Sequence, residues 1–304
     1  MADRRHLLGI LVYNGRSVVR RCLDSAAALV SDRVDVMVFD DCSPIGSPIG
    51  CHSRDQDRSW SDEVAAMCAD RALGYYRSPR NLGIPRNMSL VMLTALAGGY
   101  DCVGLINSDV VLPANLVDVV GRVLDADPSI ASVTPWSNNV SLFSMSLGCS
   151  HTTMAAQPFV SALSAALWST NGAAAIDLPT GVGFCMMIPT NAIREIGVMD
   201  PIFGRGYCEE VDWCQRARLG GRRNVLATGA FVYHEGAVTT TEAGLIQPGD
   251  TTIREHEMII TDRYPDYRQA VDMFFASGDF ATMEQRSRAA ASSAGVPVGL
   301  GAQA

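Results

Sequence analysis

Short apolar runs alternate with helical patterns through the first 135 residues of the chain. Runs of strand length cover 7–13, 34–39, 74–76, 102–106 and 130–134, and apolar residues recur at helical spacing in 18–30, 62–72, 84–97 and 114–126. Buried strands that alternate with helices predict βαβ units and an α/β fold with a mostly parallel central sheet flanked by helices, as in Rossmann-like proteins. Ligands of such sheets bind beyond the carboxyl ends of the strands. Polar side chains at those ends are therefore the first candidates for a functional site.

The pattern weakens after residue 135. Residues 136–179 are rich in Ser, Thr, Asn and Ala and predict a variable lobe with one helix near 158–168. Further strands are expected at 181–188 and 224–234, and further helices at 190–196, 209–219, 252–262, 265–276 and 279–290. A Ser-, Pro- and Gly-rich stretch at 42–61 predicts a loop, and the last dozen residues are expected to fray. We therefore expect a main domain, 1–240, with halves 1–135 and 136–240, and a helical C-terminal extension, 241–304.

Composition excludes several classes of protein. A 304-residue chain that is 48% hydrophobic and 18% charged has enough apolar residues for a full core, so it is not a disordered protein. The formal net charge of −8 and the lack of a basic stripe argue against a nucleic-acid partner. All 24 residues counted as Lys or Arg are arginine, which excludes a catalytic lysine.

The cysteines and the chain start bear on the cellular compartment. Nine cysteines without a Cys-x-x-Cys pair favour reduced thiols over a disulfide scaffold or zinc ribbon. The first apolar run ends at Asn14-Gly15-Arg16 with no cleavage signal, so no signal peptide is expected. No apolar stretch reaches the roughly 18 residues that span a membrane. We expect a cytoplasmic protein with no transmembrane segment.

Two strands end in acidic or amide side chains. One strand ends in Asn107-Ser108-Asp109, and because strand side chains alternate, Asn107 and Asp109 are expected to point the same way. Oxygen ligands at such a position suit a hard divalent cation shared with a diphosphate. Asp40 and Asp41 follow an earlier strand, where a nucleotide base or ribose would dock. Both sequences also favour simple turns, so neither decides the function alone.

A second acidic group opens a predicted helix. Glu209, Glu210 and Asp212 place three carboxylates within four residues, more than a helix N-terminus requires. Glu209 and Asp212 share one face, whereas Glu210 projects toward Trp213 and Cys214. Desolvation there would raise its pKa and suit a general base. The alternative is an ordinary acidic helix start, with Asp212 paired to Arg216.

His234 ends the apolar strand that finishes in VYH. A lone histidine at such a place is more often structural than functional. A neutral imidazole is nevertheless a good ligand for ions such as Mn²⁺.

The order of these motifs resembles a known family. VYN, FDDCSP, NLGIPRN, NSD, GVGFCM, GYCEEVDWCQRARLGG and VYH follow one another between residues 6 and 236. This order is similar to that of family 2 glycosyltransferases of the GT-A fold, in the style of bacterial rhamnosyltransferase-like members. The resemblance implies a nucleotide-binding half, 1–135, and an acceptor-binding catalytic half, 136–240.

The resemblance implies which residues bind the nucleotide-diphosphate sugar. The first strand end lies near the base, the second acid of FDD contacts the base, and the NLGIPRN segment lines the diphosphate and sugar. Asn107 and Ser108 occupy the first two positions of the family's D-x-D motif, whose last acid matches Asp109. The donor-binding residues expected on this basis are Val12, Tyr13, Asn14, Asp40, Asp41, Asn81, Gly83, Arg86, Asn87, Asn107 and Ser108.

The resemblance also implies the metal and the base. Asp109 and His234 are expected to hold a divalent metal, Mn²⁺ or Mg²⁺. Glu210 is expected to be the catalytic base, with Glu209 and Asp212 completing the catalytic group. Two departures matter: Asn107 replaces an acid, which predicts weaker metal affinity, and Cys208 stands where a glycine is usual. A Cβ at Cys208 costs free energy if that residue needs a positive φ.

The sequence thus predicts a metal-dependent, inverting hexosyltransferase that moves a sugar from a dTDP- or UDP-sugar to a hydroxyl of a small-molecule or glycan acceptor. One alternative is a catalytically weak GT-A domain that binds a sugar nucleotide or a partner without turnover. A nucleotidyltransferase is a third reading, but its glycine- and lysine-rich phosphate loop is absent. A homodimer through the C-terminal helices is a further expectation.

Overall fold

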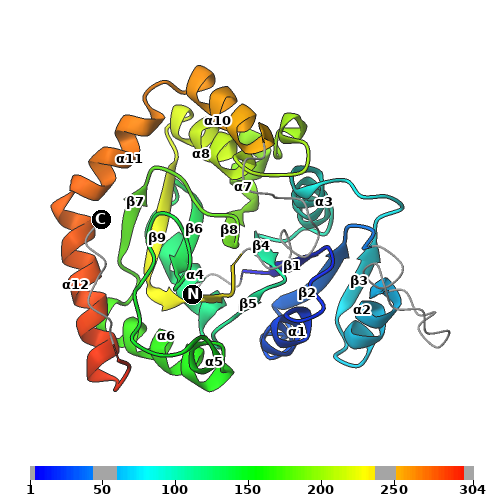
Figure 1. The fold of residues 1–304 in the computed structure, drawn as a ribbon, viewed down its shortest axis with the longest axis horizontal. Helices are drawn as coiled ribbons and strands as arrows, with labels where there is room; N and C mark the ends of the chain where they lie inside the picture. Colours follow the sequence, from blue (N-terminus) through cyan, green and yellow to red (C-terminus); the bar gives the residue numbers. More distant parts are fainter. Residues whose placement is uncertain (1–3, 44–59, 237–250, 298–304) are drawn as a thin grey trace.

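A central sheet lies between two layers of helices. The computed structural model describes residues 4–43, 60–236 and 251–297. In Figure 1, helices α3, α7 and α8 lie on one side of the sheet, and α1, α2 and α6 lie on the other. The predicted loop at 42–61 and the end of the chain fall largely outside the described residues.

The first half of the chain follows the predicted alternation of strands and helices. Its elements are β1 (His6–Val12), α1 (Val19–Ala27), β2 (Val34–Asp40), α2 (Trp60–Ala69), β3 (Gly74–Arg77), α3 (Ile84–Ala97), β4 (Cys102–Asn107), β5 (Val110–Val111), α4 (Leu116–Ala126) and β6 (Ile130–Trp136). Each of the strands and helices expected before residue 135 is present, with ends that differ from the expected ones by at most three residues.

The second half is less regular. Its elements are α5 (His151–Met154), α6 (Gln157–Asn171), β7 (Ala175–Leu178), β8 (Cys185–Pro189), α7 (Thr190–Ile196), the 3₁₀ turn η1 (Pro201–Phe203), α8 (Glu209–Leu219), β9 (Arg223–Phe231), β10 (Tyr233–His234), α10 (Thr251–Arg263), α11 (Tyr267–Ala276) and α12 (Gly278–Ser293). The strand expected at 181–188 begins only at Cys185, because residues 181–184 form a loop. The sequence pattern did not predict β7, a four-residue strand with only one buried residue.

The sheet has eight strands in the order β3-β2-β1-β4-β8-β6-β9-β7. The four strands from β3 to β4 pair in parallel, whereas β8 is antiparallel to both β4 and β6. Strands β6 and β9 are again parallel, and β7 closes the sheet antiparallel to β9. The expected α/β fold with a large, mostly parallel central sheet is confirmed, although β8 and β7 run antiparallel to their neighbours, and the reversal at β8 separates the two halves of the sheet.

Side-chain alternation along β1 builds a core on each face of the sheet. Leu8 and Ile10 pack with α1, α2 and α4, whereas Leu7 and Leu11 pack with α3, α7 and α8. All four side chains are 9% exposed or less. Because both faces are covered, the strand sequences are apolar throughout rather than alternating.

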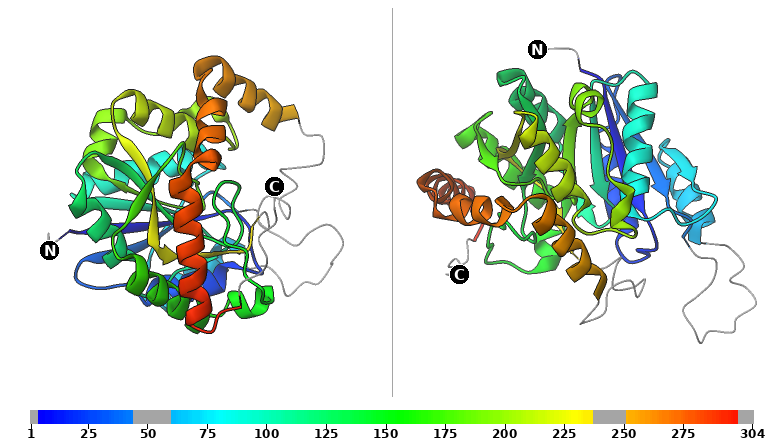
Figure 2. Two further views of the ribbon diagram at one scale, coloured as in Figure 1. Left: turned by 90° about the vertical axis from the view of Figure 1, so that its left-hand side faces the viewer. Right: turned by 90° about the horizontal axis from the view of Figure 1, so that it is seen from above.

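The three C-terminal helices run along one side of the molecule (Figure 2). Helix α12 packs against α6, where the Asn171 side-chain amide donates a buried 2.9 Å hydrogen bond to Ser287 Oγ. Helix α10 lies against the start of α8. Within the described ranges, no helix has the length and apolar character needed to cross a bilayer.

Candidate active site

The carboxyl ends of three neighbouring strands meet at one edge of the sheet. Val12 of β1 lies level with Asp40 of β2, and Leu11 lies level with Asn107 of β4. A cavity of about 90 Å³ opens there, which we call the donor cavity. Its lining residues are Leu11, Val12, Tyr13, Asp41, Asn81, Gly83, Ile84, Asn87, Asn107, Ser108 and Arg205. Most of the residues expected to bind a nucleotide sugar thus surround one space.

Asp40 and Asp41 have different partners in the structure. The Asp41 carboxylate accepts hydrogen bonds from the backbone N–H groups of Leu82 (2.6 Å) and Gly83 (2.9 Å). Burial, which outweighs these two bonds, raises the pKa of Asp41. Asp40 accepts from the Ser43 backbone N–H (2.9 Å) and the Tyr75 hydroxyl (2.8 Å) and does not line the donor cavity. It therefore fixes the strand end, whereas Asp41 shapes the cavity wall.

Two other expected donor-binding residues also lie outside the donor cavity. Asn14 has a φ of +59°, and its backbone is held by Ser43 Oγ and by the Trp60 indole N–H at 3.0 and 2.8 Å. Arg86 is exposed on the first turn of α3. The cation that lines the cavity is instead Arg205, which the motif order did not single out. Its only sequence signal is its position between Gly204 and Gly206, just before the acidic pair.

Gly83 explains how Arg205 reaches the donor cavity. A Cβ on Gly83 would lie 2.2 Å from the Gly204 carbonyl oxygen, and the φ of Gly83 is +79°. Only glycine combines this close approach with this backbone conformation. The loop before α8 therefore packs directly on the loop before α3, and together they close the cavity.

Asp109 and His234 meet through the small second sheet. Strand β10 pairs antiparallel with β5, with His234 opposite Val110, and this brings His234 Nε2 to 3.4 Å from Asp109 Oδ1. Asp109 is 2% exposed, and its Oδ1 is buried without a hydrogen-bond partner. His234 Nδ1 lies 2.8 Å from the Asn139 carbonyl, which only accepts, so Nδ1 carries a proton and Nε2 faces the carboxylate.

These two side chains fit a divalent cation. A buried, unpartnered carboxylate oxygen beside an oriented imidazole is a donor set that such ions accept. In the part of the chain that the structure describes, no group of three His, Cys, Asp or Glu side chains gathers as a ready metal site. Two protein ligands leave coordination positions for water and phosphate oxygens, as is common for Mg²⁺ bound with a nucleotide.

Helix α8 begins from an unusual turn. Gly206, Tyr207 and Cys208 have φ values of +132°, +71° and +73°. Left-handed conformations are uncommon for residues with a Cβ and occur most often at functional sites. The Cys208 position thus has the positive φ at which a side chain is costly. The turn delivers Glu209 and Glu210 into the interior.

Both glutamates are held in a poorly solvated environment. Glu209 is 4% exposed, Glu210 is half-buried, and each has one buried carboxylate oxygen without a partner. Burial and the charge of Glu210 raise the pKa of Glu209 well above its ordinary value. Burial likewise raises the pKa of Glu210. A carboxylate with a raised pKa is a stronger base when ionised.

Glu210 opens into a second cavity of about 460 Å³, which we call the acceptor cavity. Its walls are Ser141, Leu142, Thr180, Gly181, Val182, Cys208, Glu210, Val211, Glu257, Ile260, Thr261, Tyr264, Pro265, Tyr267, Arg268, Val271 and Asp272. Burial and the charge of Glu210 raise the pKa of Tyr267. Helices α10 and α11 thus supply much of the wall opposite the glutamate.

Asp212 has a different environment from its two acidic neighbours. It is fully buried, and its oxygens accept from Arg216 (2.9 Å), Arg263 (2.7 Å) and the Tyr264 hydroxyl (2.9 Å). The alternative pairing with Arg216 is therefore observed. With its oxygens occupied, Asp212 joins α10 to α8 and does not line either cavity.

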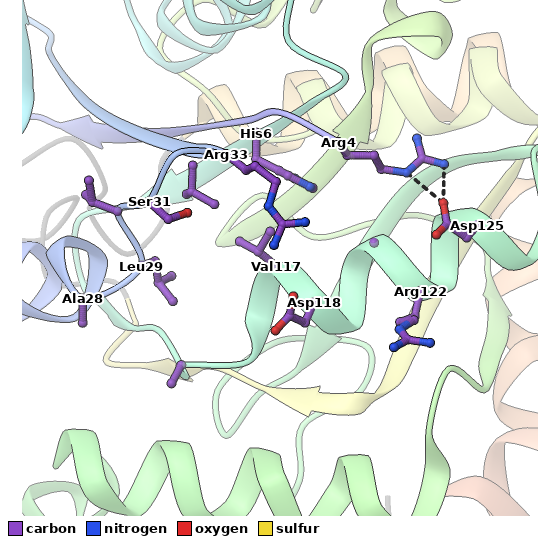
Figure 3. Close-up of a pocket in the computed structure, with 14 residues that line it drawn as sticks. Arg4, His6, Ala28, Leu29, Ser31, Arg33, Val117, Asp118, Arg122 and Asp125 are labelled. Atoms are coloured by element: carbon purple, nitrogen blue, oxygen red, sulfur yellow. Dashed lines mark hydrogen bonds and ion pairs between the residues drawn. The ribbon is translucent and has the colours of Figure 1, made fainter. Parts of the chain in front are cut away.

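A third cavity, of about 250 Å³, lies at the amino ends of β1 and β2 (Figure 3). Arg4, Arg33 and Arg122 line it with His6, and Arg4 pairs with Asp125 at 2.8 Å. It contains none of the motif residues. The predicted chemistry therefore gathers at the opposite edge of the sheet.

Comparison with solved structures gives similar folds at low identity. GalNAc-T7, solved with UDP, GalNAc and Mn²⁺, aligns with a TM-score of 0.56 and 12% identity over 97% of this chain and 55% of its own. S. aureus TarS 1-349 aligns with a TM-score of 0.48 and 11% identity over 78% of this chain and 62% of its own. Mannosyltransferase PcManGT from Pyrobaculum calidifontis, solved with GDP-Man and Mn²⁺, aligns with a TM-score of 0.49 and 14% identity over 96% of this chain and 87% of its own. No protein-family model and no curated protein matches the sequence.

The similarity to GalNAc-T7 establishes the fold. The chain has the α/β architecture of the GT-A glycosyltransferases. It spans less than two thirds of the length of the GalNAc-T7 and TarS chains, at 55% and 62%.

Proposed function

We propose that the chain is an inverting glycosyltransferase that moves a sugar from a nucleotide-diphosphate sugar to an acceptor hydroxyl. One observation carries this proposal: a single short segment lines two cavities of different chemistry. Arg205 lines the donor cavity, and Cys208 and Glu210 line the acceptor cavity. A cation that suits a diphosphate and a poorly solvated carboxylate thus lie five residues apart in the chain, each at a different cavity. The GT-A fold and the complex of GalNAc-T7 with UDP, GalNAc and Mn²⁺ support glycosyl transfer from a nucleotide sugar.

The donor is assigned to the donor cavity. Val12, Tyr13 and Asp41 line the side assigned to the base, and Asn81 and Gly83 the side assigned to the diphosphate. Arg205 is placed to pair with the diphosphate, since a guanidinium matches phosphate geometry. We propose a hexosyl donor carried on dTDP or UDP, as in the rhamnosyltransferase-like members of family 2.

Asp109 and His234 would hold the divalent metal, Mn²⁺ or Mg²⁺, and Asn107, two residues before Asp109, lines the donor cavity. When bound, such an ion stabilises the charge that develops on the leaving diphosphate. Because Asn107 stands where a second acidic residue is usual, this site depends on the nucleotide for the rest of its coordination. Metal and nucleotide are therefore expected to bind together.

Glu210 is assigned as the general base. Its carboxylate accepts the proton of an acceptor hydroxyl that lies in the acceptor cavity. The hydroxyl oxygen attacks the anomeric carbon from the face opposite the diphosphate, so the anomeric configuration inverts. Holding the two substrates in line supplies much of the rate, because the reaction then becomes effectively unimolecular.

The acceptor cavity favours an acceptor with one apolar face. Val182, Val211, Ile260 and Val271 form apolar walls, and Tyr264 contributes a ring. The charged groups Glu257, Arg268 and Asp272 are all exposed. A hydroxylated small molecule and a glycan that stacks one ring face on tyrosine both fit these walls.

All described cysteines are free thiols, which agrees with a cytoplasmic enzyme.

A non-catalytic GT-A domain is the second candidate. The observation that favours it is the small number of acidic metal ligands, with Asn107 in place of an acid. Such a domain would bind a sugar nucleotide without releasing the diphosphate.

Turnover of the donor distinguishes the two candidates. The protein is incubated with UDP-, dTDP- and GDP-hexoses and Mn²⁺, with and without candidate acceptors, and free nucleoside diphosphate is measured. We expect release with one nucleotide class. Glu210→Gln should lower the rate by about 10²- to 10⁴-fold, the usual contribution of a general base, with donor affinity unchanged. The matched control is Glu255→Gln, an exposed carboxylate on α10 that lines neither cavity, which should retain activity. Binding without release, under all conditions, would favour the second candidate.

A further inference from the structure

Helix α10, from the C-terminal extension, contacts the turn that precedes the glutamates. His256 of α10 is 6% exposed, and its Nδ1 lies 3.0 Å from the Gly206 carbonyl oxygen and 3.1 Å from that of Tyr207. Carbonyl oxygens only accept, so Nδ1 carries the proton and donates to both. One buried N–H thus joins two consecutive peptide groups of the turn.

The turn needs such support because its backbone is unfavourable. Tyr207 and Cys208 are side-chain-bearing residues with φ near +72°, at +71° and +73°. Gly206 is fixed as well, since a Cβ there would lie 2.9 Å from Ile84 Cδ1. Left-handed backbone at residues with a Cβ persists only where surrounding contacts impose it. The first helical hydrogen bond of α8, from Asp212 N–H to the Cys208 carbonyl (2.9 Å), starts directly from this turn.

The His256 ring is itself held in one orientation. Phe203, which is fully buried, packs edge-on against it with ring centroids 5.4 Å apart and an interplanar angle of 87°. The next residue, Glu257, lines the acceptor cavity. One turn of α10 therefore contacts the Gly206–Cys208 turn and also forms part of the wall of the acceptor cavity.

We propose that His256 is a positioning residue: it holds the Gly206–Cys208 turn so that the Glu210 carboxylate stays aimed into the acceptor cavity. The inference rests on the proposed role of Glu210 as the base. It makes the C-terminal extension a part of the active site rather than an appendage. His256 acts through hydrogen bonds to backbone and touches no reacting atom.

Three substitutions separate hydrogen bonding from packing. His256→Asn keeps a donor close to the place of Nδ1, His256→Gln moves the donor one bond further out, and His256→Leu keeps bulk without a donor. Met258→Ala is the matched control, because Met258 lies on the same helix and is 58% exposed. If His256→Leu fails to fold, the Asn and Gln variants still differ in the one feature under test.

The first readout needs no substrate. Burial and the charges of Glu210, Glu209 and Glu257 raise the pKa of Cys208 to about 12, so its thiol should react slowly. Alkylation of Cys208 is followed by peptide mass spectrometry on the whole protein. We expect at least a roughly tenfold faster reaction in His256→Leu and His256→Gln, because thiolate fraction and exposure both rise when the turn loosens. His256→Asn and Met258→Ala should react like the parent protein.

The second readout is turnover of the nucleotide sugar identified in the screen above. His256→Leu and His256→Gln should lower kcat on the order of 10- to 100-fold through misplacement of Glu210, with the Kd for the nucleotide unchanged. His256→Asn should recover most of that loss.

The outcomes distinguish this inference from the proposed function. If Asn and Gln variants behave alike in both readouts, the positioning role is overturned while transferase activity stands. If no variant and no parent protein turns over any donor, the proposed function fails, and with it the link to Glu210. The Cys208 reaction then still shows whether His256 holds the turn.

Discussion

Glu209 and Glu210 are neighbouring carboxylates, each with one buried oxygen that has no hydrogen-bond partner. The folded protein keeps Glu209 protonated at pH values where an unfolded chain would ionise it, because burial and Glu210 raise its pKa. Below the ordinary pKa, about 4.5, both states are protonated and the residue has no effect on stability. As the pH rises toward the folded pKa, the free energy of unfolding falls. Such a residue is retained at the expense of stability, as is common in active sites.

Glu209→Gln is therefore expected to raise the melting temperature at pH 8 and to leave it unchanged at pH 4. Each unit of pKa shift corresponds to about 1.4 kcal/mol, which is a few degrees for a chain of this size. Thermal unfolding followed by circular dichroism at both pH values measures this. Glu195→Gln is the control of opposite sign, because Arg222 lowers the pKa of Glu195. Equal effects of Glu209→Gln at pH 4 and pH 8 would contradict the assignment.

Motif order in the sequence predicted most residues of the donor cavity and the contact between Asp109 and His234. It did not predict which carboxylates are free to act. The Asp40 partner Tyr75 and the Asp212 partners Arg263 and Tyr264 lie far away in sequence, so their bonds depend on the tertiary structure. Arg205 and His256 were missed because each lies in a stretch with no motif. Only loop packing at Gly83 and docking of α10 bring them to the site.

At the scale of elements, the packing of the loop before α3 on the loop before α8 depends on Gly83. We expect Gly83→Ala to abolish nucleotide binding, since its Cβ would meet the Gly204 carbonyl at 2.2 Å and displace the Arg205 loop. Gly99→Ala is the matched control: its φ is also positive, at +67°, but nothing lies within 4 Å of the new Cβ. Gly99→Ala should lose about 1–2 kcal/mol of stability from its positive φ, and Gly83→Ala should lose more, because its φ of +79° and ψ of 156° are essentially confined to glycine and its Cβ would clash; only Gly83→Ala should lose binding. Urea unfolding and calorimetry measure the two effects, and similar binding in both variants would refute the role of Gly83.

Docking of α10 on α8 depends on the buried carboxylate of Asp212. Tyr264→Phe removes one hydrogen bond to it and should lower the free energy of unfolding by about 1 kcal/mol while nucleotide affinity stays unchanged. Tyr76→Phe, an exposed tyrosine against Phe39, should have no effect. Urea denaturation gives both values. A loss of nucleotide binding in Tyr264→Phe would show that α10 also shapes the donor cavity.

The prediction of elements succeeded where local signals were strong. Helix α3 begins at Ile84 with Pro85 in its first turn, and α8 begins with three acidic residues, both favourable helix starts. Strand β10 was predicted as the end of one long strand, but the chain leaves the main sheet after Phe231 and pairs with β5. Pairing partners of such short strands are set by tertiary contacts rather than by local pattern. That departure is the one that brings His234 to Asp109.

For the molecule as a whole, the reversal of strand direction at β8 separates the two halves to which the proposed function assigns donor binding and acceptor binding. The parallel strands β1, β2 and β4 end around the donor cavity, whereas α8, α10 and α11 contribute to the walls of the acceptor cavity. The segment that contains Arg205 and Glu210 joins them. Nucleotide and metal are therefore expected to bind together at the carboxyl ends of β1, β2 and β4, where His234 of β10 meets Asp109, independently of any acceptor.

The most direct measurement is calorimetric titration of UDP, dTDP and GDP, each with and without Mn²⁺, into the whole protein and into Asp109→Asn. We predict tight binding of one nucleotide only when the metal is present. Loss of a residue that only hydrogen-bonds a metal ligand costs roughly 10- to 100-fold in metal affinity. Asp109→Asn changes a proposed ligand itself, so it should weaken nucleotide binding by more than that. Glu210→Gln should bind like the parent protein. The absence of nucleotide binding under every condition, or binding of equal strength without metal and in Asp109→Asn, would contradict the account.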